Sequence, residues 1–114
     1  MTYTLYGLKN CDMCRKAVKA LEGVGKKVTF VDIRGEGVDA RKIEDWADEA
    51  GWDTLLNKRS TTWRKLSEAD KTDIDEEKAV KLMAAHRALI KRPVVQWGNE
   101  IFVGWGTDTQ DALL

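Results

Sequence analysis

The chain has 114 residues, of which 43% are hydrophobic, and this is enough to bury the core of one domain and to exclude a disordered chain. Its 19 basic and 19 acidic residues balance, so the net charge does not favour bulk binding to nucleic acids or to anionic membranes. The chain opens without a basic region followed by an apolar stretch, and no apolar run reaches the roughly 20 residues that span a bilayer, so we expect a soluble cytoplasmic protein without membrane or direct nucleic-acid partners.

The first third of the chain predicts a strand, a helix and a second strand. Residues 2–6 form an apolar, strand-like run, and apolar residues then recur at a helical spacing until Gly23, with Asn10 able to cap the helix. Residues 28–33 contain a second strand-like run. Two strands joined by such a helix pair in parallel through a right-handed crossover, so the pattern predicts a βαβ unit.

The only two cysteines, Cys11 and Cys14, form a C-x-x-C pair where the predicted helix begins. Backbone N–H groups and the partial positive charge at a helix N-terminus stabilise a thiolate. They lower a cysteine pKa from about 8.5 to between about 3.5 and 7.5. Cys11 lies at the extreme N-terminus, so it is the predicted nucleophile. Cys14 lies one turn inward, where it could attack a mixed disulfide formed on Cys11.

Other interpretations of this pair stay open. Two cysteines are too few for the disulfide framework of a small secreted protein. A structural zinc site needs about four ligands, whereas the chain has two cysteines and one histidine, His86, far along the sequence, so we expect no metal. Cys14 falls on the apolar stripe of its helix and could be a buried small hydrophobic residue, which would leave an enzyme with one cysteine.

Helical signals dominate the middle of the chain. Residues 43–50 carry apolar side chains on one helical face, and Ser67 with Asp70 matches a capping box before a short helix. A further amphipathic pattern covers about residues 75–89. Together these signals predict a helical insertion over about residues 38–90.

The end of the chain predicts a hairpin and a last helix. Residues 94–97 and 101–103 are strand-like and flank a Gly-Asn pair that favours a tight turn. Thr107 and Gln110 match a second capping box. The order β, α, β, helical insertion, β, β, α is that of an α/β thioredoxin-like fold with a four-stranded mixed sheet. Without a repeat or a linker, it predicts a single domain over residues 1–114.

The loop before the third strand would bring further residues to the cysteines. In a thioredoxin-like sheet this loop faces the first helix, so Arg92 and Pro93 would lie near Cys11. A proline here is often cis, and Pro93 would leave the backbone of its neighbour free to pair with an extended thiol substrate. Arg92 would stabilise the thiolate or hold an anion with its planar guanidinium, and Arg59 is a second candidate for that role. Alternatively, Arg92 is a solvated charge beside an ordinary loop proline.

Four stretches carry a resemblance to a known family, and they are residues 5–11, 55–66, 89–93 and 103–105. Together, and over essentially the whole chain, they resemble the ArsC/Spx superfamily, the glutaredoxin-type arsenate reductases and their relatives. The resemblance implies a thioredoxin-like core with a helical insertion. It also implies a nucleophile at Cys11 and an anion-facing arginine at Arg92.

The same resemblance draws attention to three departures. Arsenate reductases of this type carry a histidine where this chain has Gly7, an arginine at the position of Asn57, and another arginine after the hairpin, where residues 104–106 are Gly-Trp-Gly. These differences speak against arsenate as the physiological substrate. A branch of arsenate-reductase-like proteins, proposed to be glutathione-dependent thiol reductases, fits the chain more closely.

On these grounds the sequence predicts a thiol-disulfide oxidoreductase related to arsenate reductase and dependent on glutathione. No tightly bound cofactor is expected, because glutathione would be a co-substrate. The expected partners are glutathione or glutaredoxin and a small thiol, disulfide or oxyanion. The residues expected to act are Cys11, Cys14 and Arg92 in catalysis, and Asn10, Arg59 and Pro93 in substrate binding.

Two alternative functions stay open. The C-x-x-C pair and Arg59 with Ser60 also resemble Spx regulators, in which a redox-switched domain binds RNA polymerase. The second alternative is arsenate reduction itself. The sequence also leaves open whether Cys14 resolves the intermediate or is structural.

Overall fold

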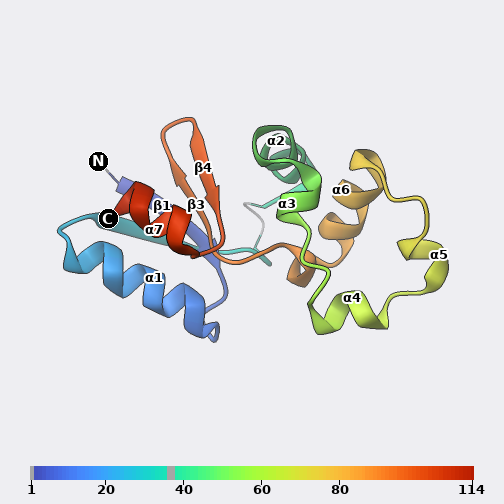
Figure 1. The fold of residues 1–114 in the computed structure, drawn as a ribbon, viewed down its shortest axis with the longest axis horizontal. Coiled ribbons are helices and arrows are strands. Elements are labelled where there is room, and N and C mark those ends of the chain that lie inside the picture. The colour runs from blue at the N-terminus through green and yellow to red at the C-terminus, as the bar shows by residue number, and fades with distance from the viewer. Residues whose placement is uncertain (1, 36–37) are drawn as a thin grey trace. The chain divides into compact units, whose positions relative to one another are not determined.

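One sheet joins the two ends of the chain. In the computed structural model, which describes residues 2–35 and 38–114, the strands are β1 (Thr2–Gly7), β2 (Lys27–Asp32), β3 (Val94–Trp97) and β4 (Glu100–Val103). Their order in the sheet is β2-β1-β3-β4. β1 pairs with β2 in parallel and with β3 antiparallel, and β3 and β4 form the hairpin (Figure 1). This confirms the predicted four-stranded mixed sheet.

The helices are α1 (Asp12–Gly23), α2 (Ala40–Ala50), α3 (Trp52–Leu55), α4 (Thr61–Lys65), α5 (Glu68–Lys71), α6 (Glu76–Ala85), a 3-10 turn at Arg87–Leu89 and α7 (Thr107–Leu113). Two of them, α3 and α4, were not predicted. They have four and five residues, and an apolar period of 3.6 residues is not visible over so short a stretch.

The described residues divide into two compact units. The first consists of the residues up to Gly35 together with Arg92–Leu114, and the second ends at Lys91. The whole sheet, α1 and α7 belong to the first unit, whereas α2 to α6 belong to the second. Among residues 2–35 and 38–114, no helix is long and apolar enough to cross a bilayer.

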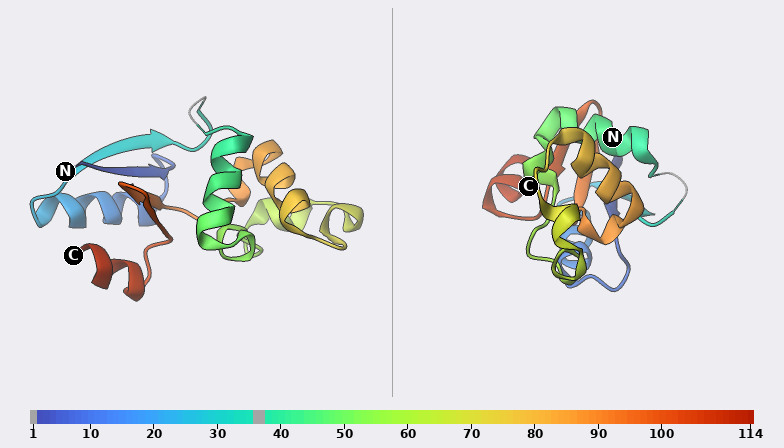
Figure 2. Two further views of the ribbon diagram at one scale, coloured as in Figure 1. Left: turned by 90° about the horizontal axis from the view of Figure 1, so that it is seen from above. Right: turned by 90° about the vertical axis from the view of Figure 1, so that its right-hand side faces the viewer.

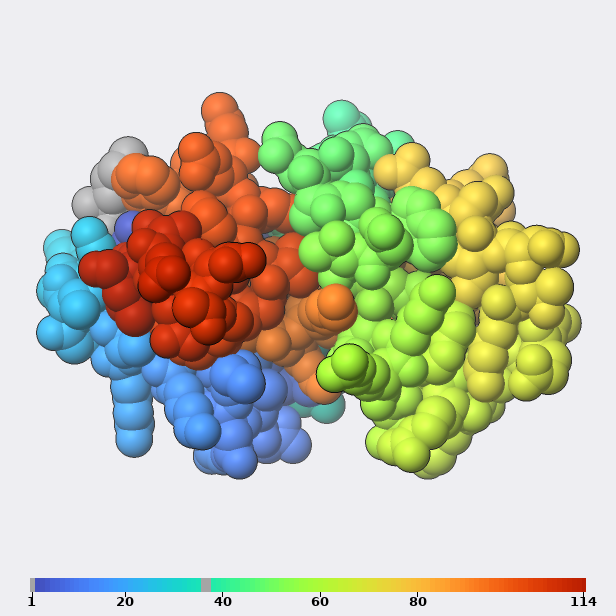
Figure 3. Space-filling model, in the orientation of Figure 1, coloured from blue at the N-terminus to red at the C-terminus, as the bar shows by residue number. Residues whose placement is uncertain are grey.

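In the first unit, α1 and α7 cover the same face of the sheet (Figure 2). In α1 the buried positions Cys14, Ala17 and Leu21 follow a helical spacing. Burying a leucine side chain fully contributes about 1.5–3 kcal/mol, so this stripe fixes the helix on the sheet. Figure 3 shows the side chains of α7, in red, packed closely beside those of the hairpin, in orange. The buried residues of this core are Tyr3, Leu5, Cys14, Ala17, Leu21, Val95, Trp105 and Leu113.

The second unit has its own buried core and its own backbone links. Asp39 caps α2 by accepting a hydrogen bond from the Lys42 N–H at 2.9 Å. The N–H of Asn57 donates to the carbonyl of Leu89 at 2.7 Å, which joins the segment before α4 to the end of the unit. Its fully buried side chains include Ile43, Leu55, Met83, Leu89 and Ile90.

The sequence predicted some helix ends correctly and others incorrectly. Ser67 caps α5 as expected, and its hydroxyl accepts from the Asp70 N–H at 3.2 Å. The prediction that Thr107 caps the last helix was wrong, because α7 begins after Gly106 and the amide of Gln110 instead donates to the carbonyl of Trp105. The helix predicted to reach about residue 89 ends at Ala85, and a 3-10 turn follows.

Candidate active site

The turn between β1 and α1 places Cys11 at the very start of the helix. Its backbone is extended (φ −94°, ψ 118°), it is the N-cap residue, and its carbonyl accepts the first helical hydrogen bond from Arg15 at 3.1 Å. The Cys11 N–H donates back to the carbonyl of Leu8 at 3.1 Å, which closes the turn. Asn10 therefore lies in the turn and does not cap the helix, contrary to the sequence prediction. The sulfur of Cys11 is left beside the free N–H groups of the first turn.

The surroundings of Cys11 favour its thiolate. The side chain is partly buried, and burial raises its pKa. The N–H of Cys14, the thiol of Cys14, the charge of Arg92 and the N–H of Met13 together outweigh burial and lower the pKa below its ordinary value. Cys11 makes no side-chain capping hydrogen bond of regular geometry, so we attribute the effect of the N–H groups to their field at longer range.

Cys14, in contrast to Cys11, is buried and favours the protonated thiol. Its side chain is 0% exposed and belongs to the core of the first unit. Burial raises its pKa to about 11, the Leu8 N–H opposes burial, and the neighbouring Cys11 acts in the same direction as burial. Cys14 is therefore a neutral thiol at physiological pH. It is suited to donate a hydrogen bond to Cys11.

Arg92 and Pro93 stand at the start of β3. The charge of Arg92, which is partly exposed, is the next influence on the pKa of Cys11 after burial and the N–H and thiol of Cys14. The peptide bond between Arg92 and Pro93 is cis, and Pro93 is buried. The carbonyl of Pro93 accepts from the Gly104 N–H at 2.7 Å, which ties the loop to the end of β4. The first unit thus brings together Cys11, Cys14 and Arg92.

The two remaining candidates have different places. Asn10 is exposed in the turn just before Cys11, and its role in substrate binding stays a prediction. Arg59 belongs to the second unit, and its N–H donates to the side-chain oxygen of Asn57 at 3.0 Å. Its side chain is exposed. A role for Arg59 at Cys11 stays a prediction.

Gly7, the last residue of β1, is a member of the site that sequence reasoning treated only as a missing histidine. A Cβ atom at this position would lie 2.4 Å from the sulfur of Cys14. The signal that could have revealed it is a glycine at the end of an apolar strand, since such glycines often mark the close approach of another group.

A hollow of about 450 Å³ lies beside α1. Arg15 at its rim also pairs with Asp12. The surface of the hollow is mainly apolar, three cationic side chains and the carboxylate of Glu22 contribute to its lining, and Cys11 is not part of it. The residues that line it are Lys9, Cys14, Arg15, Val18, Lys19, Glu22 and Phe30.

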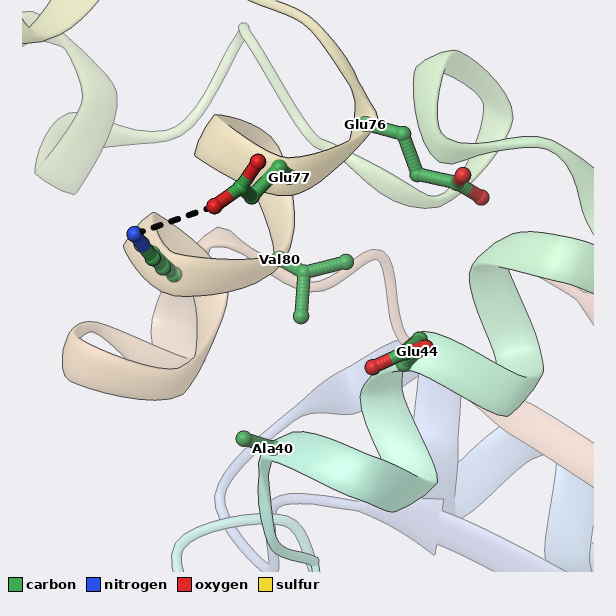
Figure 4. A pocket seen from close by; sticks show the side chains of 6 residues that line it. Ala40, Glu44, Glu76, Glu77 and Val80 are labelled. Atoms are coloured by element: carbon green, nitrogen blue, oxygen red, sulfur yellow. Dashed lines mark ion pairs between the residues drawn. The ribbon is translucent and has the colours of Figure 1, made fainter.

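A different hollow, of about 480 Å³, lies in the second unit. Figure 4 shows Glu44 and Glu76 near Val80 and the ion pair between Glu77 and Lys81, which is 3.3 Å long. The residues that line this hollow are Ala40, Glu44, Glu76, Glu77, Val80 and Lys81, and neither cysteine is among them. In the part of the chain that the structure describes, no group of three or more histidine, cysteine or carboxylate side chains could hold a metal ion.

Comparisons with known proteins agree with this architecture. The solved structure of the YFFB protein is 43% identical, matches with a TM-score of 0.91 and covers 98% of both chains. An arsenate reductase (ArsC) related protein from Brucella melitensis is 38% identical with a TM-score of 0.80, over 98% of this chain and 93% of the other. An uncharacterised protein of Haemophilus influenzae is 38% identical over 90% of each chain.

The match to a family model covers nearly the whole sequence. The model of the ArsC family matches residues 6–113, a range that includes both cysteines and the Arg92–Pro93 pair. The solved relatives share the thioredoxin-like fold that the order of strands and helices predicted, and that fold is confirmed. The chain therefore belongs to the ArsC family, as its resemblance to the ArsC/Spx superfamily implied.

Proposed function

We propose that the protein is a thiol-disulfide oxidoreductase that reduces glutathione mixed disulfides with Cys11 as nucleophile. The observation that carries this proposal is the asymmetry of the two thiols. Cys11 is partly accessible and its surroundings favour the anion, whereas Cys14 is buried and holds its proton. Only a thiolate attacks a disulfide at a useful rate.

The first step forms a disulfide on the enzyme. The Cys11 thiolate attacks the glutathione sulfur of a mixed disulfide R–S–S–G, the S–S bond breaks, and R–S⁻ leaves and takes up a proton. Arg92 contributes a positive charge near the reacting sulfurs, which stabilises the incoming thiolate and the leaving one. The lowered pKa of Cys11 also makes it the better leaving group in the following step.

The second step removes glutathione from the enzyme. A second glutathione thiolate attacks the glutathione sulfur of the Cys11 mixed disulfide, which releases oxidised glutathione and restores the Cys11 thiolate. In the balance, one glutathione thiol is consumed: R–S–S–G and glutathione give R–SH and oxidised glutathione, so the sulfur of the incoming glutathione is oxidised while the R sulfur is reduced, and the proton lost by glutathione passes to R–S⁻. Cys14 could attack Cys11 only after losing a proton, and its pKa of about 11 and its complete burial oppose that route. We therefore assign resolution to glutathione.

The comparisons support the general reaction class. The family is that of ArsC, and relatives at 38–43% identity include an arsenate reductase related protein. Glutaredoxin is a further candidate partner, because it exchanges the same glutathione disulfide.

The test is a coupled assay with glutathione, glutathione reductase and a glutathione mixed disulfide of 2-mercaptoethanol. The wild-type protein is expected to turn over this substrate, Cys11→Ser to lose at least about 100-fold in rate because its nucleophile is gone, and Cys14→Ser to keep turning over. Unchanged turnover by Cys11→Ser would overturn the proposal. Loss of turnover in Cys14→Ser alone would instead assign resolution to Cys14.

The two alternatives from the sequence have their own assays. Arsenate reduction predicts turnover of arsenate with glutathione and glutaredoxin. A redox-switched regulator predicts that RNA polymerase binds the protein with an affinity that changes when Cys11 and Cys14 are oxidised. Both remain sequence predictions.

A further inference from the structure

The last residue of β1 and the second cysteine occupy one small space. A Cβ atom built on Gly7 lies 2.4 Å from the sulfur of Cys14, 3.2 Å from its Cβ and 3.5 Å from Leu5 Cδ2. The first distance is far inside van der Waals contact, so no side chain fits at position 7 while the sulfur of Cys14 stays in place.

Position 7 requires glycine because there is no space for a side chain, and not because the backbone adopts a conformation that favours glycine. Gly7 lies in a regular strand that pairs with β2, and it is not among the glycines with a positive φ in the described chain. An alanine could adopt the same extended backbone. The single feature of Gly7 that the fold uses is the missing Cβ.

The sulfur of Cys14 has little freedom to move aside. The residue is 0% exposed and packs in the core with Leu5, Ala17 and Leu21. In this position Cys14 lies one helical turn from Cys11, which packs against the same core, and the Leu8 N–H and Cys11 both influence the pKa of the Cys14 thiol. A methyl group on residue 7 would contact the Cys14 sulfur directly, so it would displace this sulfur from its position beside Leu8 and Cys11.

We infer that Gly7 is a positioning residue of the redox site: by leaving room for the Cys14 thiol it holds that thiol as the hydrogen-bond donor to the Cys11 thiolate. Cys14 then serves to stabilise the nucleophile. Gly7 and Cys14 act as a unit, so a change at either position has the same consequence at Cys11. The inference rests on the proposed function only in assigning Cys11 as the reacting thiol.

The test is the rate of Cys11 alkylation by iodoacetamide as a function of pH, followed by mass spectrometry, for the wild type, Gly7→Ala, Cys14→Ala and the double variant. Loss of a hydrogen bond to a charged group is expected to raise the midpoint by about one pH unit in each single variant. The double variant is expected to match Cys14→Ala, because the sulfur that the new methyl group would displace is already absent. Gly23→Ala is the matched control, since nothing lies within 4 Å of a Cβ there, and its midpoint should equal that of the wild type.

Two outcomes would overturn the inference. One is a Gly7→Ala midpoint equal to that of the wild type, and the other is a double variant whose shift is the sum of the two single shifts. If Gly7→Ala does not fold, thermal unfolding of the double variant tests the steric link. The double variant should fold, because Cys14→Ala removes the sulfur that the new methyl group would contact. A double variant that stays unfolded would reject the steric link.

This experiment is separate from the turnover assay. If glutathione mixed disulfides are not substrates, turnover fails in every variant while the alkylation midpoints keep the predicted pattern. If the positioning role fails, the midpoints coincide while the wild type still turns over. The failure of one claim is therefore distinguishable from the failure of the other.

Discussion

The pKa of Cys11 is lowered and that of Cys14 is raised, and the two thiols, three residues apart at the start of α1, shift each other in these opposite directions. Burial raises the pKa of each thiol. At Cys11 the nearby N–H groups, the Cys14 thiol and Arg92 outweigh burial, whereas at Cys14 burial prevails. A C-x-x-C pair that is symmetric in sequence therefore becomes one nucleophile and one donor.

The buried thiol predicts a loss of stability in alkali. The pKa of Cys14 is about 11 in the folded protein and lies near the ordinary cysteine value when unfolded, so its contribution to the free energy of unfolding is complete below about pH 8.5. It is lost as the pH rises through 11, since unfolding then releases a proton. We expect urea unfolding of the reduced protein to show a steeper decline between pH 9 and 11 than that of Cys14→Ala. Equal slopes would contradict this.

The charge of Arg92 predicts a change in thiol reactivity. Arg92→Ala should raise the midpoint of Cys11 alkylation, because a positive charge that favours the thiolate is removed. Arg92→Lys keeps the charge and should recover most of the shift. Arg34→Ala is the control, since Arg34 pairs with Asp32 and is not among the groups that act on Cys11. A midpoint that is the same in Arg92→Ala and the wild type would remove Arg92 from the site.

A cluster of carboxylates in the second unit predicts a stabilising substitution. A hydrogen bond to Asp48, partial desolvation and the charges of Asp48 and Glu44 raise the pKa of Glu76. Because the pKa of Glu76 is raised in the fold, its protonated form contributes stability at low pH, and this contribution is lost as the pH rises through the raised pKa and the carboxylates repel. Asp48→Asn should raise the thermal midpoint by about 2 °C at pH 7.

The rise in thermal midpoint caused by Asp48→Asn should become smaller toward pH 4, where Glu76 is protonated. Thermal unfolding monitored by circular dichroism at the two pH values measures the difference. The same gain at both values would show that the repulsion between Asp48 and Glu76 is not its source.

We expect that a cavity in the core beneath α1 lowers the free energy of unfolding strongly. Leu21 is 0% exposed and packs in the core of the first unit, so Leu21→Ala should lower the free energy of unfolding by about 2–5 kcal/mol. Val24→Ala is the matched control at the end of the same helix, where the side chain is 50% exposed, and it should cost less than about 0.5 kcal/mol. Urea unfolding of both variants at pH 7 measures this, and similar costs would contradict the assignment of the core.

The sheet and the place of the cysteines could be predicted because their signals are local. Each signal extends over only a few residues: the apolar runs of the strands, the apolar spacing of α1 and the turn at Gly98. Together they predicted the mixed sheet that the structure shows. The thioredoxin-like topology placed the Arg92–Pro93 loop near Cys11 although it lies far away in sequence, and the family resemblance added the anion-facing role of Arg92. The cap at Asn10 failed because a turn closed by Leu8 and Cys11 makes Cys11 the first residue of the helical ladder.

Other features depend on packing and could not be predicted. The short helices α3 and α4 have too few residues for a period. The contact between Gly7 and Cys14 joins residues of a strand and a helix whose side-chain positions exist only in the folded core. For the same reason the sequence left the role of Cys14 open, whereas its burial and its hydrogen bonds favour a donor.

The most direct test of the account is the pH dependence of iodoacetamide alkylation in the reduced wild-type protein, read separately for each cysteine by mass spectrometry. We predict that Cys11 reacts first, with a midpoint below the value of about 8.5 for a free cysteine, while Cys14 stays unmodified until the protein unfolds. A midpoint for Cys11 at or above that value, or modification of Cys14 before Cys11, would contradict the central claim.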